Sequence, residues 1–381
     1  MVTLFSILII IRVMTETLFV NTNTLSHWLE SGKQVAVLDI RPKDQREEWK
    51  IPGSIYIDAY KRLNDGDASV LDEVSIPRNV PVVTVCAAGR TSRIAAGELR
   101  KKGIEAYSLE NGMKGWSLAW NKAMLNFQGY QIVQLRRTGK GCLSYIISSE
   151  DEAIIVDASL PLEVYENTCK ENNWQLKAVM ETHIHADHLS RSKQVADKFG
   201  VPLLLPVPNK VQFDFKKLTD GEMIELGKTQ IKVVATPGHT VESVCFLIND
   251  EVLLSGDTIF TNAIGRPDLK ANEEETKKRA KLLYDSLQQL LQLNEEIIVL
   301  PAHTSSPVDF DGKPVSATLS EIKKNVSILN SDKEAFVKNI LDKLPPPPSN
   351  YLTIVETNLS GNISGINPID LEAGANRCAV S

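Results

Sequence analysis

The chain has 381 residues, of which 43% are hydrophobic and 24% are charged, and its formal net charge is −6. This length is greater than that of an ordinary domain with a single hydrophobic core, so we expect two domains. The composition excludes a disordered protein. The acidic balance argues against a nucleic-acid partner. Five cysteines, an odd number without a CxxC pair, argue against a disulfide framework and favour a reducing, cytoplasmic location.

The first thirteen residues, MVTLFSILIIIRV, are largely apolar. This run is too short to span a bilayer as a helix, and it has neither a basic stretch before it nor a small-residue cleavage site after it. Met14 opens an ordinary polar sequence. We therefore expect residues 1–13 to be a spurious leader, translation to start at Met14, and the protein to have no membrane partner. A short membrane anchor is the alternative.

Three segments in the first third of the chain are predicted to be strands, and the first two are apolar runs typical of strands buried in a parallel sheet. They cover residues 35–40, 81–85 and 105–109, and a segment with helical spacing at 92–102 follows the second run. Alternation of strand and helix predicts a small α/β domain, which we place at residues 14–125.

The second apolar run leads directly into the loop Cys86-Ala-Ala-Gly-Arg-Thr-Ser92. A short loop between a strand and a helix can converge its backbone N–H groups, and the helix N-terminus adds positive potential. Such a cradle stabilises a thiolate and holds an anion such as thiosulfate, sulfite or a persulfide end. We predict that Cys86 is a nucleophile and that Arg90 supplies charge. The alternative is a buried structural cysteine before a helix cap.

This loop resembles the active-site loop of the rhodanese family, and the likeness covers about residues 17–125. Three further segments follow the order of that family: Leu38-Asp-Ile-Arg41, Ile51-Pro-Gly-Ser-Ile55 and NGMKGWSLAW at 111–120. Lys50 departs from the family pattern, which usually has histidine at that structural position. The resemblance implies an α/β rhodanese domain that carries sulfur as a persulfide on Cys86, either as an active sulfurtransferase or as a sensor or docking module.

From about residue 126 the pattern changes to many short strands with few helices. One long helix is predicted at 273–293, with an apolar face made of Ala280, Leu283, Leu287 and Leu290. This pattern indicates two packed sheets covered by helices over residues 126–381. The predicted strands cover 143–147, 153–157, 178–180, 203–205, 231–234, 244–248, 252–254 and 297–300.

Five of the six histidines lie in this second region. The motif Thr182-His-Ile-His-Ala-Asp-His188 follows the strand predicted at 178–180. Offsets of two, four and five residues cannot share one face of a helix, so the motif must be a loop that converges on a point. Imidazoles together with carboxylates suit zinc or iron. Further ligand-type side chains follow later strands, namely His239, Asp257 and His303.

Together these motifs resemble the metallo-β-lactamase superfamily, which implies an αββα sandwich after the rhodanese domain. The superfamily has two metal positions. By the resemblance, the first would use His183, His185, His239 and Asp257. The second would use Asp187, His188, Asp257 and His303.

Within the superfamily, the region from residue 130 is most similar to the persulfide dioxygenases. The segments Ala263-Ile-Gly-Arg-Pro-Asp268 and Gly374-Ala-Asn-Arg-Cys-Ala-Val380 carry this similarity. It implies one Fe(II) per chain, held by His183, His239 and Asp257. The remaining ionisable residues would orient these ligands and handle protons, with Asp187 among the catalytic groups: His185, Asp187, His188 and His303.

Two positions bear on the substrate. Arg266 is predicted to hold an anionic part of the thiol carrier, and a structural salt bridge is its alternative. After His303 the chain has Thr-Ser-Ser, where the dioxygenases usually have Asp-Tyr. The other four cysteines are interpreted as structural.

The implied reaction is oxidation by O₂ of glutathione persulfide, or a related low-molecular-weight persulfide, to sulfite. The rhodanese domain would transfer sulfur to or from thiosulfate or sulfite. Zinc has no accessible redox step and cannot activate O₂, so the metal decides the reaction. The alternative is a glyoxalase II-type thioester hydrolase with two Zn(II) ions. The fused sulfur-carrier domain favours sulfur chemistry, and the chain is also a candidate for a homo-oligomer.

Overall fold

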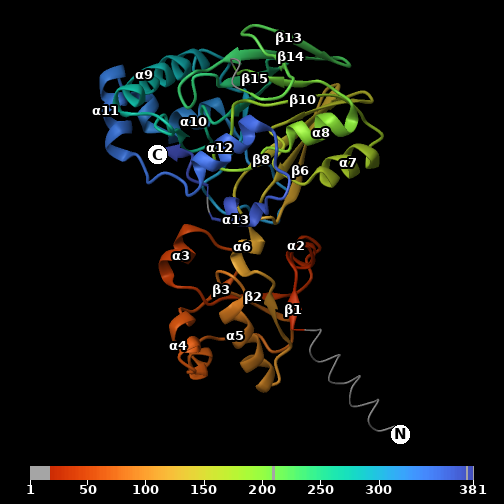
Figure 1. The fold of residues 1–381 in the computed structure, drawn as a ribbon, viewed down its shortest axis with the longest axis vertical. Helices are drawn as coiled ribbons and strands as arrows, with labels where there is room; N and C mark the ends of the chain where they lie inside the picture. The colour runs from red at the N-terminus through yellow and green to blue at the C-terminus, as the bar shows by residue number, and fades with distance from the viewer. Residues whose placement is uncertain (1–17, 208–210, 375, 381) are drawn as a thin grey trace.

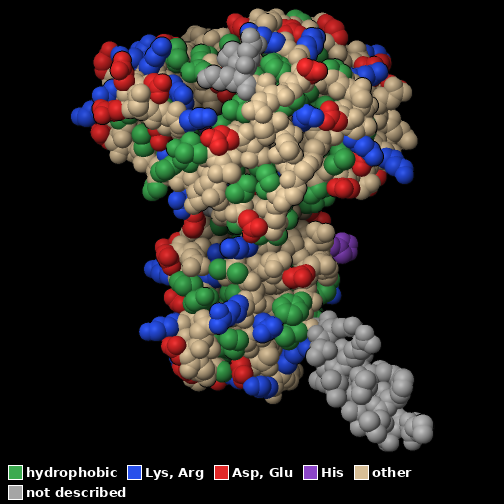
Figure 2. Space-filling view, in the orientation of Figure 1, with side chains coloured by type: hydrophobic (Ala, Val, Ile, Leu, Met, Phe, Trp, Pro, Cys, Tyr) green, Lys and Arg blue, Asp and Glu red, His purple; other side chains and the backbone are tan. Residues whose placement is uncertain are grey.

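The computed structural model describes residues 18–207, 211–374 and 376–380, which form a smaller N-terminal body and a larger C-terminal body (Figure 1). The expected leader at 1–13 and the expected start at Met14 lie outside the described residues. Within the described part, no helix has the length and hydropathy that crossing a bilayer requires. Figure 2 shows acidic and basic side chains interspersed over the visible face of both bodies.

The smaller body is a five-stranded parallel sheet with strand order β1-β5-β4-β2-β3. The strands predicted at 35–40, 81–85 and 105–109 are confirmed, with central strands that are buried because helices cover both faces. In chain order the elements are β1 (Phe19–Val20), α2 (Thr22–Glu30), β2 (Ala36–Asp39), α3 (Lys43–Glu48), β3 (Ile55–Tyr56), α4 (Tyr60–Asn64), η1 (Ala68–Asp72), β4 (Val82–Val85), α5 (Arg90–Lys101), β5 (Ala106–Leu109) and α6 (Gly112–Trp116).

The larger body is a sandwich of two sheets with a shared apolar core between them. The first sheet has the order β12-β11-β10-β9-β8-β7-β6. Its strands are β6 (Asn121–Phe127), β7 (Tyr130–Arg136), β8 (Leu143–Ser149), β9 (Glu152–Val156), β10 (Gln175–Met180), β11 (Leu203–Leu205) and β12 (Lys216–Lys217). The second sheet has the order β13-β14-β15-β16-β18-β19. Its strands are β13 (Met223–Leu226), β14 (Thr229–Ala235), β15 (Val244–Ile248), β16 (Val252–Gly256), β18 (Ile298–Pro301) and β19 (Ala317–Thr318).

Helices cover the outer face of each sheet, so the predicted αββα sandwich is confirmed (Figure 1). The first sheet packs against α7 (Leu162–Glu171), α8 (Ser192–Phe199) and α12 (Tyr351–Ser360). The second packs against α9 (Glu273–Leu290), α10 (Leu319–Asn325), η2 (Ser327–Asn330) and α11 (Lys333–Lys343). Near the C-terminus lie α13 (Pro368–Glu372) and β20 (Ala379–Val380), which pairs with β17 (Ile264–Gly265).

Helix α9 illustrates how local sequence sets an element. Asn272 and Glu275 form a capping box at its N-terminus, and the four predicted apolar positions are all buried. The helix ends at Leu290, three residues before the predicted end. The expected domain boundary between 125 and 126 falls inside β6, whose pairing with β7 begins at Asn121. The first sheet of the sandwich therefore starts before the predicted boundary.

Candidate metal centre and candidate sulfur-transfer loop

The candidate metal ligands all follow strand ends at one edge of the sandwich. Strands β14, β16 and β18 run in the same direction, because β15 is antiparallel to both β14 and β16 while β18 is parallel to β16. His239, Asp257 and His303 follow these three strands, and His183 follows β10 of the other sheet. The backbone bond from Val244 N to Thr182 O ties the two sheets at this edge.

His183, His239 and Asp257 form a compact buried group. Asp257 Oδ2 lies 3.8 Å from His183 Nε2 and 3.5 Å from His239 Nε2. One ligand atom from each residue lies within 4.8 Å of the others. Among the described residues, neither His183 Nε2 nor Asp257 Oδ2 has a hydrogen-bond partner. Buried polar atoms without partners are rare, and converging nitrogen and carboxylate atoms fit a transition metal.

The outer atoms of the two histidines are fixed by hydrogen bonds. His239 Nδ1 lies 2.7 Å from Arg266 O, which can only accept, so this nitrogen carries the proton. Thr182 Oγ1 donates to Asp157 Oδ2 and lies 2.9 Å from His183 Nδ1, which therefore donates to it. Each Nε2 is left with a free lone pair, as a metal ligand needs.

Burial and neighbouring charges prepare the group for a cation. Burial lowers the pKa of His183 and of His239, so both imidazoles are neutral near neutral pH. Burial opposes ionisation of Asp257, but the facing histidines, led by His303, hold the pKa of its carboxyl well below the usual range. Two neutral imidazoles and one carboxylate are the protonation states of a metal site.

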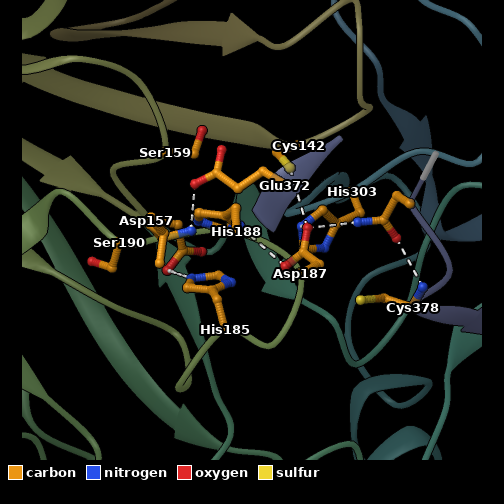
Figure 3. Close-up of polar contacts among 12 residues, drawn as sticks. Cys142, Asp157, Ser159, His185, Asp187, His188, Ser190, His303, Glu372 and Cys378 are labelled. Atoms are coloured by element: carbon orange, nitrogen blue, oxygen red, sulfur yellow. Dashed lines mark hydrogen bonds and ion pairs between the residues drawn. The ribbon is translucent and has the colours of Figure 1, made fainter. Parts of the chain in front are cut away.

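His185 is not part of this group. Its Nε2 lies 3.1 Å from Asp157 Oδ1 and 3.8 Å from Glu181 Oε2. Burial opposes its charge, but Asp157 and Glu181 raise the pKa of His185 to about 9. Figure 3 shows His185 beside Asp157 and apart from Asp187 and His303. The other ring nitrogen of His185, Nδ1, is buried and has no hydrogen-bond partner among the described residues.

A second buried group lies on the other side of Asp257. It brings together Asp187, His188 and His303 of the expected second position with Cys142, which sequence reasoning had interpreted as structural, and the group does not include Asp257, the fourth residue expected there. The Cys142 thiol donates to Asp187 Oδ2 over 3.2 Å. His303 links the two groups through its Nδ1, which lies 2.5 Å from Asp257 Oδ1. The one available signal in the sequence was the position of Cys142 immediately before a predicted strand.

The C-terminal tail contacts both groups. Asn376 Nδ2 donates to Asp187 Oδ2 over 2.8 Å. Cys378 lies with Asp257 and His303, one ligand atom from each being within 4.8 Å of the others. Burial raises the pKa of the Cys378 thiol well above its usual value. The tail that carried the family resemblance thus forms part of the wall of the site.

Arg266 does not face a substrate, which corrects its predicted role. Its side chain is fully buried and forms a double ion pair with Asp268, with bonds of 2.7 and 2.8 Å. Its remaining donors bond backbone carbonyls of Pro345, Pro346 and Arg377. Because every donor is used inside the protein, Arg266 acts as a structural salt bridge, the alternative weighed for it.

A cavity of about 270 Å³ opens beside His239. Its wall is largely apolar and includes Ile184, Val207, Leu269 and Leu359. Four charged side chains also line it, two acidic and two basic: Glu242, Lys270, Glu275 and Arg279. The cavity can therefore take a small molecule of mixed charge with one end at the metal group.

The loop predicted for sulfur transfer follows β4 in the smaller body. Cys86 is buried, and Ser92 Oγ donates to its Sγ over 3.3 Å. Gly89 has φ of +83°, and a Cβ on Gly112 would lie 2.2 Å from Cys86 O. The loop is thus packed against the turn before α6 and needs both glycines. Arg90 is the first residue of α5 and is exposed.

Comparison with known proteins agrees with this division. Residues 21–119 match the family model of the rhodanese-like domain, and residues 137–214 and 204–303 match that of the metallo-beta-lactamase superfamily. A hydroxyacylglutathione hydrolase of Francisella philomiragia is 31% identical over 217 residues, which cover 52% of this chain and 83% of that protein. The chain belongs to the metallo-beta-lactamase superfamily, with a rhodanese domain at its N-terminus.

Two solved structures share the fold. A metallo-beta-lactamase of Staphylococcus aureus has a TM-score of 0.56 and 26% identity, and the match covers 63% of this chain and 73% of that one. ETHE1 from Myxococcus xanthus has a TM-score of 0.51 and 23% identity, over 63% of this chain and 99% of that one. The second likeness concerns the fold alone.

Proposed function

We propose that the second domain oxidises a low-molecular-weight persulfide with O₂ at a single iron held by His183, His239 and Asp257. The overall reaction is RSSH + O₂ + H₂O → RSH + SO₃²⁻ + 2 H⁺, in which the outer sulfur is oxidised and O₂ is reduced. Bound iron would supply the redox step that zinc lacks. The sequence similarity to persulfide dioxygenases supports this assignment.

The observation that carries the proposal is the position of His185. A ligand set of two histidines and one carboxylate leaves positions free for two reactants on non-haem iron. A fourth protein ligand would remove one of them. Here Asp157 and Glu181 hold His185, with 3.1 Å between His185 Nε2 and Asp157 Oδ1. The three ligand atoms that support the proposal are those of His183, His239 and Asp257, which lie within 4.8 Å of one another, while His185 Nδ1 is buried without a hydrogen-bond partner among the described residues.

The cavity beside His239 supports a thiol carrier of mixed charge, such as glutathione. Lys270 and Arg279 can pair with carboxylates, while Glu242 and Glu275 can pair with an ammonium group. If the persulfide group of the substrate pointed at His239, the rest of the thiol carrier would lie in the cavity. The five free, buried cysteines support a reducing, cytoplasmic setting.

The Francisella relative supports a second candidate, hydrolysis of a glutathione thioester by two zinc ions. Such a site places a metal-activated water between two ions. The two functions share a carrier and a cavity, so the reaction itself must be measured.

The test uses the full chain, purified without oxygen and loaded with Fe(II). We expect one iron per chain, O₂ uptake on addition of glutathione persulfide, and sulfite as product. His183→Gln should lose iron and O₂ uptake. His185→Gln is the matched variant and should retain both to within about 10–100-fold, the usual effect of a residue that only orients ligands. Two tightly held zinc ions, thioester hydrolysis and no O₂ uptake by the iron-loaded chain would reject the proposal.

A further inference from the structure

We propose that Asn358 on α12 is a positioning residue that couples the occupancy of the cavity beside His239 to the geometry of the metal loop, residues 183–188. An occupied cavity and a bound metal would then stabilise each other. The inference rests on the proposed function for the carrier and for the metal group, but it does not depend on the reaction that follows.

The side chain of Asn358 bonds three backbone groups of the metal loop and of the segment directly after it. Its Nδ2 donates to His185 O and to His188 O, each over 2.9 Å, and its Oδ1 accepts a 2.9 Å bond from Ser190 N. Asn358 is buried. The loop has no regular secondary structure, so its backbone groups depend on partners from other segments. A single side-chain amide therefore holds the loop against α12.

A neighbouring face of α12 lines the cavity. Tyr351, Val355 and Leu359 recur at intervals of four residues, which places them on one side of the helix, and all three line the cavity. The metal loop lines the same cavity through Ile184 and Ala186. A molecule in the cavity would therefore contact α12 and the metal loop at the same time.

Helix α12 is only lightly buried. Of its ten residues, Ile354 and Asn358 are the two that are buried. Val355 and Leu359 are partly buried against the outer face of the first sheet. An occupant of the cavity would cover more of these two side chains, and burial of apolar surface stabilises the position of the helix.

The helix connects this gain to the metal loop. A helix of ten residues moves largely as one body, so a contact on its cavity face also restrains Asn358. The restrained amide holds the backbone on both sides of Asp187. Contacts that orient metal ligands are typically worth about 10–100-fold in metal affinity. Because coupling between two binding sites is reciprocal, a bound metal would tighten the binding of the carrier by the same factor.

The test measures the iron affinity of the full-length chain by equilibrium competition with a chelator, without oxygen, in the presence and absence of S-methylglutathione. This probe has the frame of glutathione but a blocked sulfur, so it cannot bind iron as a thiolate. We expect the probe to tighten iron binding at least about fivefold in the wild type, the lower end of typical coupling between sites. In Asn358→Ala the probe should still bind, but the iron affinity should no longer respond to it.

Thr357→Ala is the matched control. Its hydroxyl donates to Thr353 O within α12, so its loss leaves the bonds to the metal loop in place and the coupling should be retained. Hydrogen exchange of the iron-loaded wild type covers the case in which Asn358→Ala does not fold. The probe should slow exchange in α12 and in the metal loop together.

Three outcomes would overturn the inference. These are an iron affinity of the wild type that does not respond to the probe, a coupling that persists in Asn358→Ala, and protection of α12 without protection of the metal loop. O₂ uptake with glutathione persulfide is measured separately. A chain that shows the coupling but consumes no O₂ would retain this inference and reject the proposed reaction.

Discussion

At the scale of single residues, motif and side-chain direction carry different information. The loop 183–188 was expected to converge on a point, yet its second histidine turns to Asp157. Likewise Arg266 lies in the motif that resembles the dioxygenases, but its guanidinium group donates its hydrogen bonds to Asp268 and to backbone carbonyls. A motif determines the position of a residue in the backbone, while the residues packed around the side chain determine its direction and its contacts. Those partners come from distant segments and are not visible in the local sequence.

The prediction at this scale concerns Cys86. Cys86→Ser should abolish sulfur transfer from thiosulfate to an acceptor, because a hydroxyl in the same cradle is a far weaker nucleophile than a thiolate. Oxygen uptake with supplied persulfide should remain close to that of the wild type. The two activities are assayed on one preparation, with Cys169→Ser, a buried cysteine on α7, as the control. Sulfur transfer that survives in Cys86→Ser would point to another nucleophile.

At the scale of elements, continuous apolar runs predicted the buried strands well, because a strand covered on both faces needs few polar residues. Strands β6 and β7 were not predicted. In β6 exposed Lys122, Met124 and Asn126 alternate with buried residues that include Asn121, so the apolar alternation is blurred. Helices α12 and α13 were not predicted either, because what holds them in place is contact with the distant loop at 183–189, which the local sequence does not show. Asn358 on α12, for example, donates to His185 O and His188 O.

The prediction at this scale concerns Glu372 at the end of α13. Its buried carboxylate pairs with Arg137 at 2.8 Å, lies 3.7 Å from Arg191, and accepts a 2.7 Å bond from Leu189 N, directly after the metal loop. Glu372→Gln leaves buried arginine charge uncompensated and should cost about 3–5 kcal/mol of unfolding free energy. Denaturant unfolding measures this. Glu48→Gln, which removes the exposed ion pair with Arg377, should cost about 1 kcal/mol or less.

The same carboxylate predicts a pH dependence. Burial works against its charge, but Arg137 and Arg191 hold the pKa of Glu372 below its usual value in the folded protein. Its contribution is therefore present above the pKa of the unfolded chain and is lost as the pH falls through the folded value. The stability gap between wild type and Glu372→Gln should narrow in acid. A gap that is constant or widens on acidification would contradict this.

At the scale of the whole molecule, the segment 137–142 joins the two domains to the metal region. Thr138 O accepts a 3.1 Å bond from Trp49 Nε1 of the rhodanese domain, and Arg137 Nη2 donates to Ser117 O. A Cβ on Gly141 would lie 3.1 Å from the Trp49 ring and 2.3 Å from Thr304 O. Cys142 then bridges to His303. Two domains were predicted, and the contact between them could not be predicted from the motifs of either domain.

The prediction at this scale is that Trp49→Ala loosens the metal region from a distance. Loss of the ring and its hydrogen bond should cost about 3–5 kcal/mol, as for other buried aromatic truncations. It should also speed metal loss during dialysis, because Gly141 and the neighbouring Cys142 lose their support. Trp28→Ala, which removes a partly buried ring packed on Tyr107, is the control and should leave metal retention unchanged. Equal metal loss in both variants would show that Trp49 acts only through general stability.

The contact between Trp49 and Gly141 also limits how this architecture can be recombined. Fused domains are often treated as interchangeable parts joined by a linker. Here a donor rhodanese domain would have to present an aromatic ring with an N–H at the position of Trp49, since Gly141 is flanked by that ring on one side and Thr304 on the other. A rhodanese domain that is chosen only for its sulfur-transfer loop would lose the contact with Gly141 and so alter the second domain. The two domains should therefore be exchanged together with the residues of their interface.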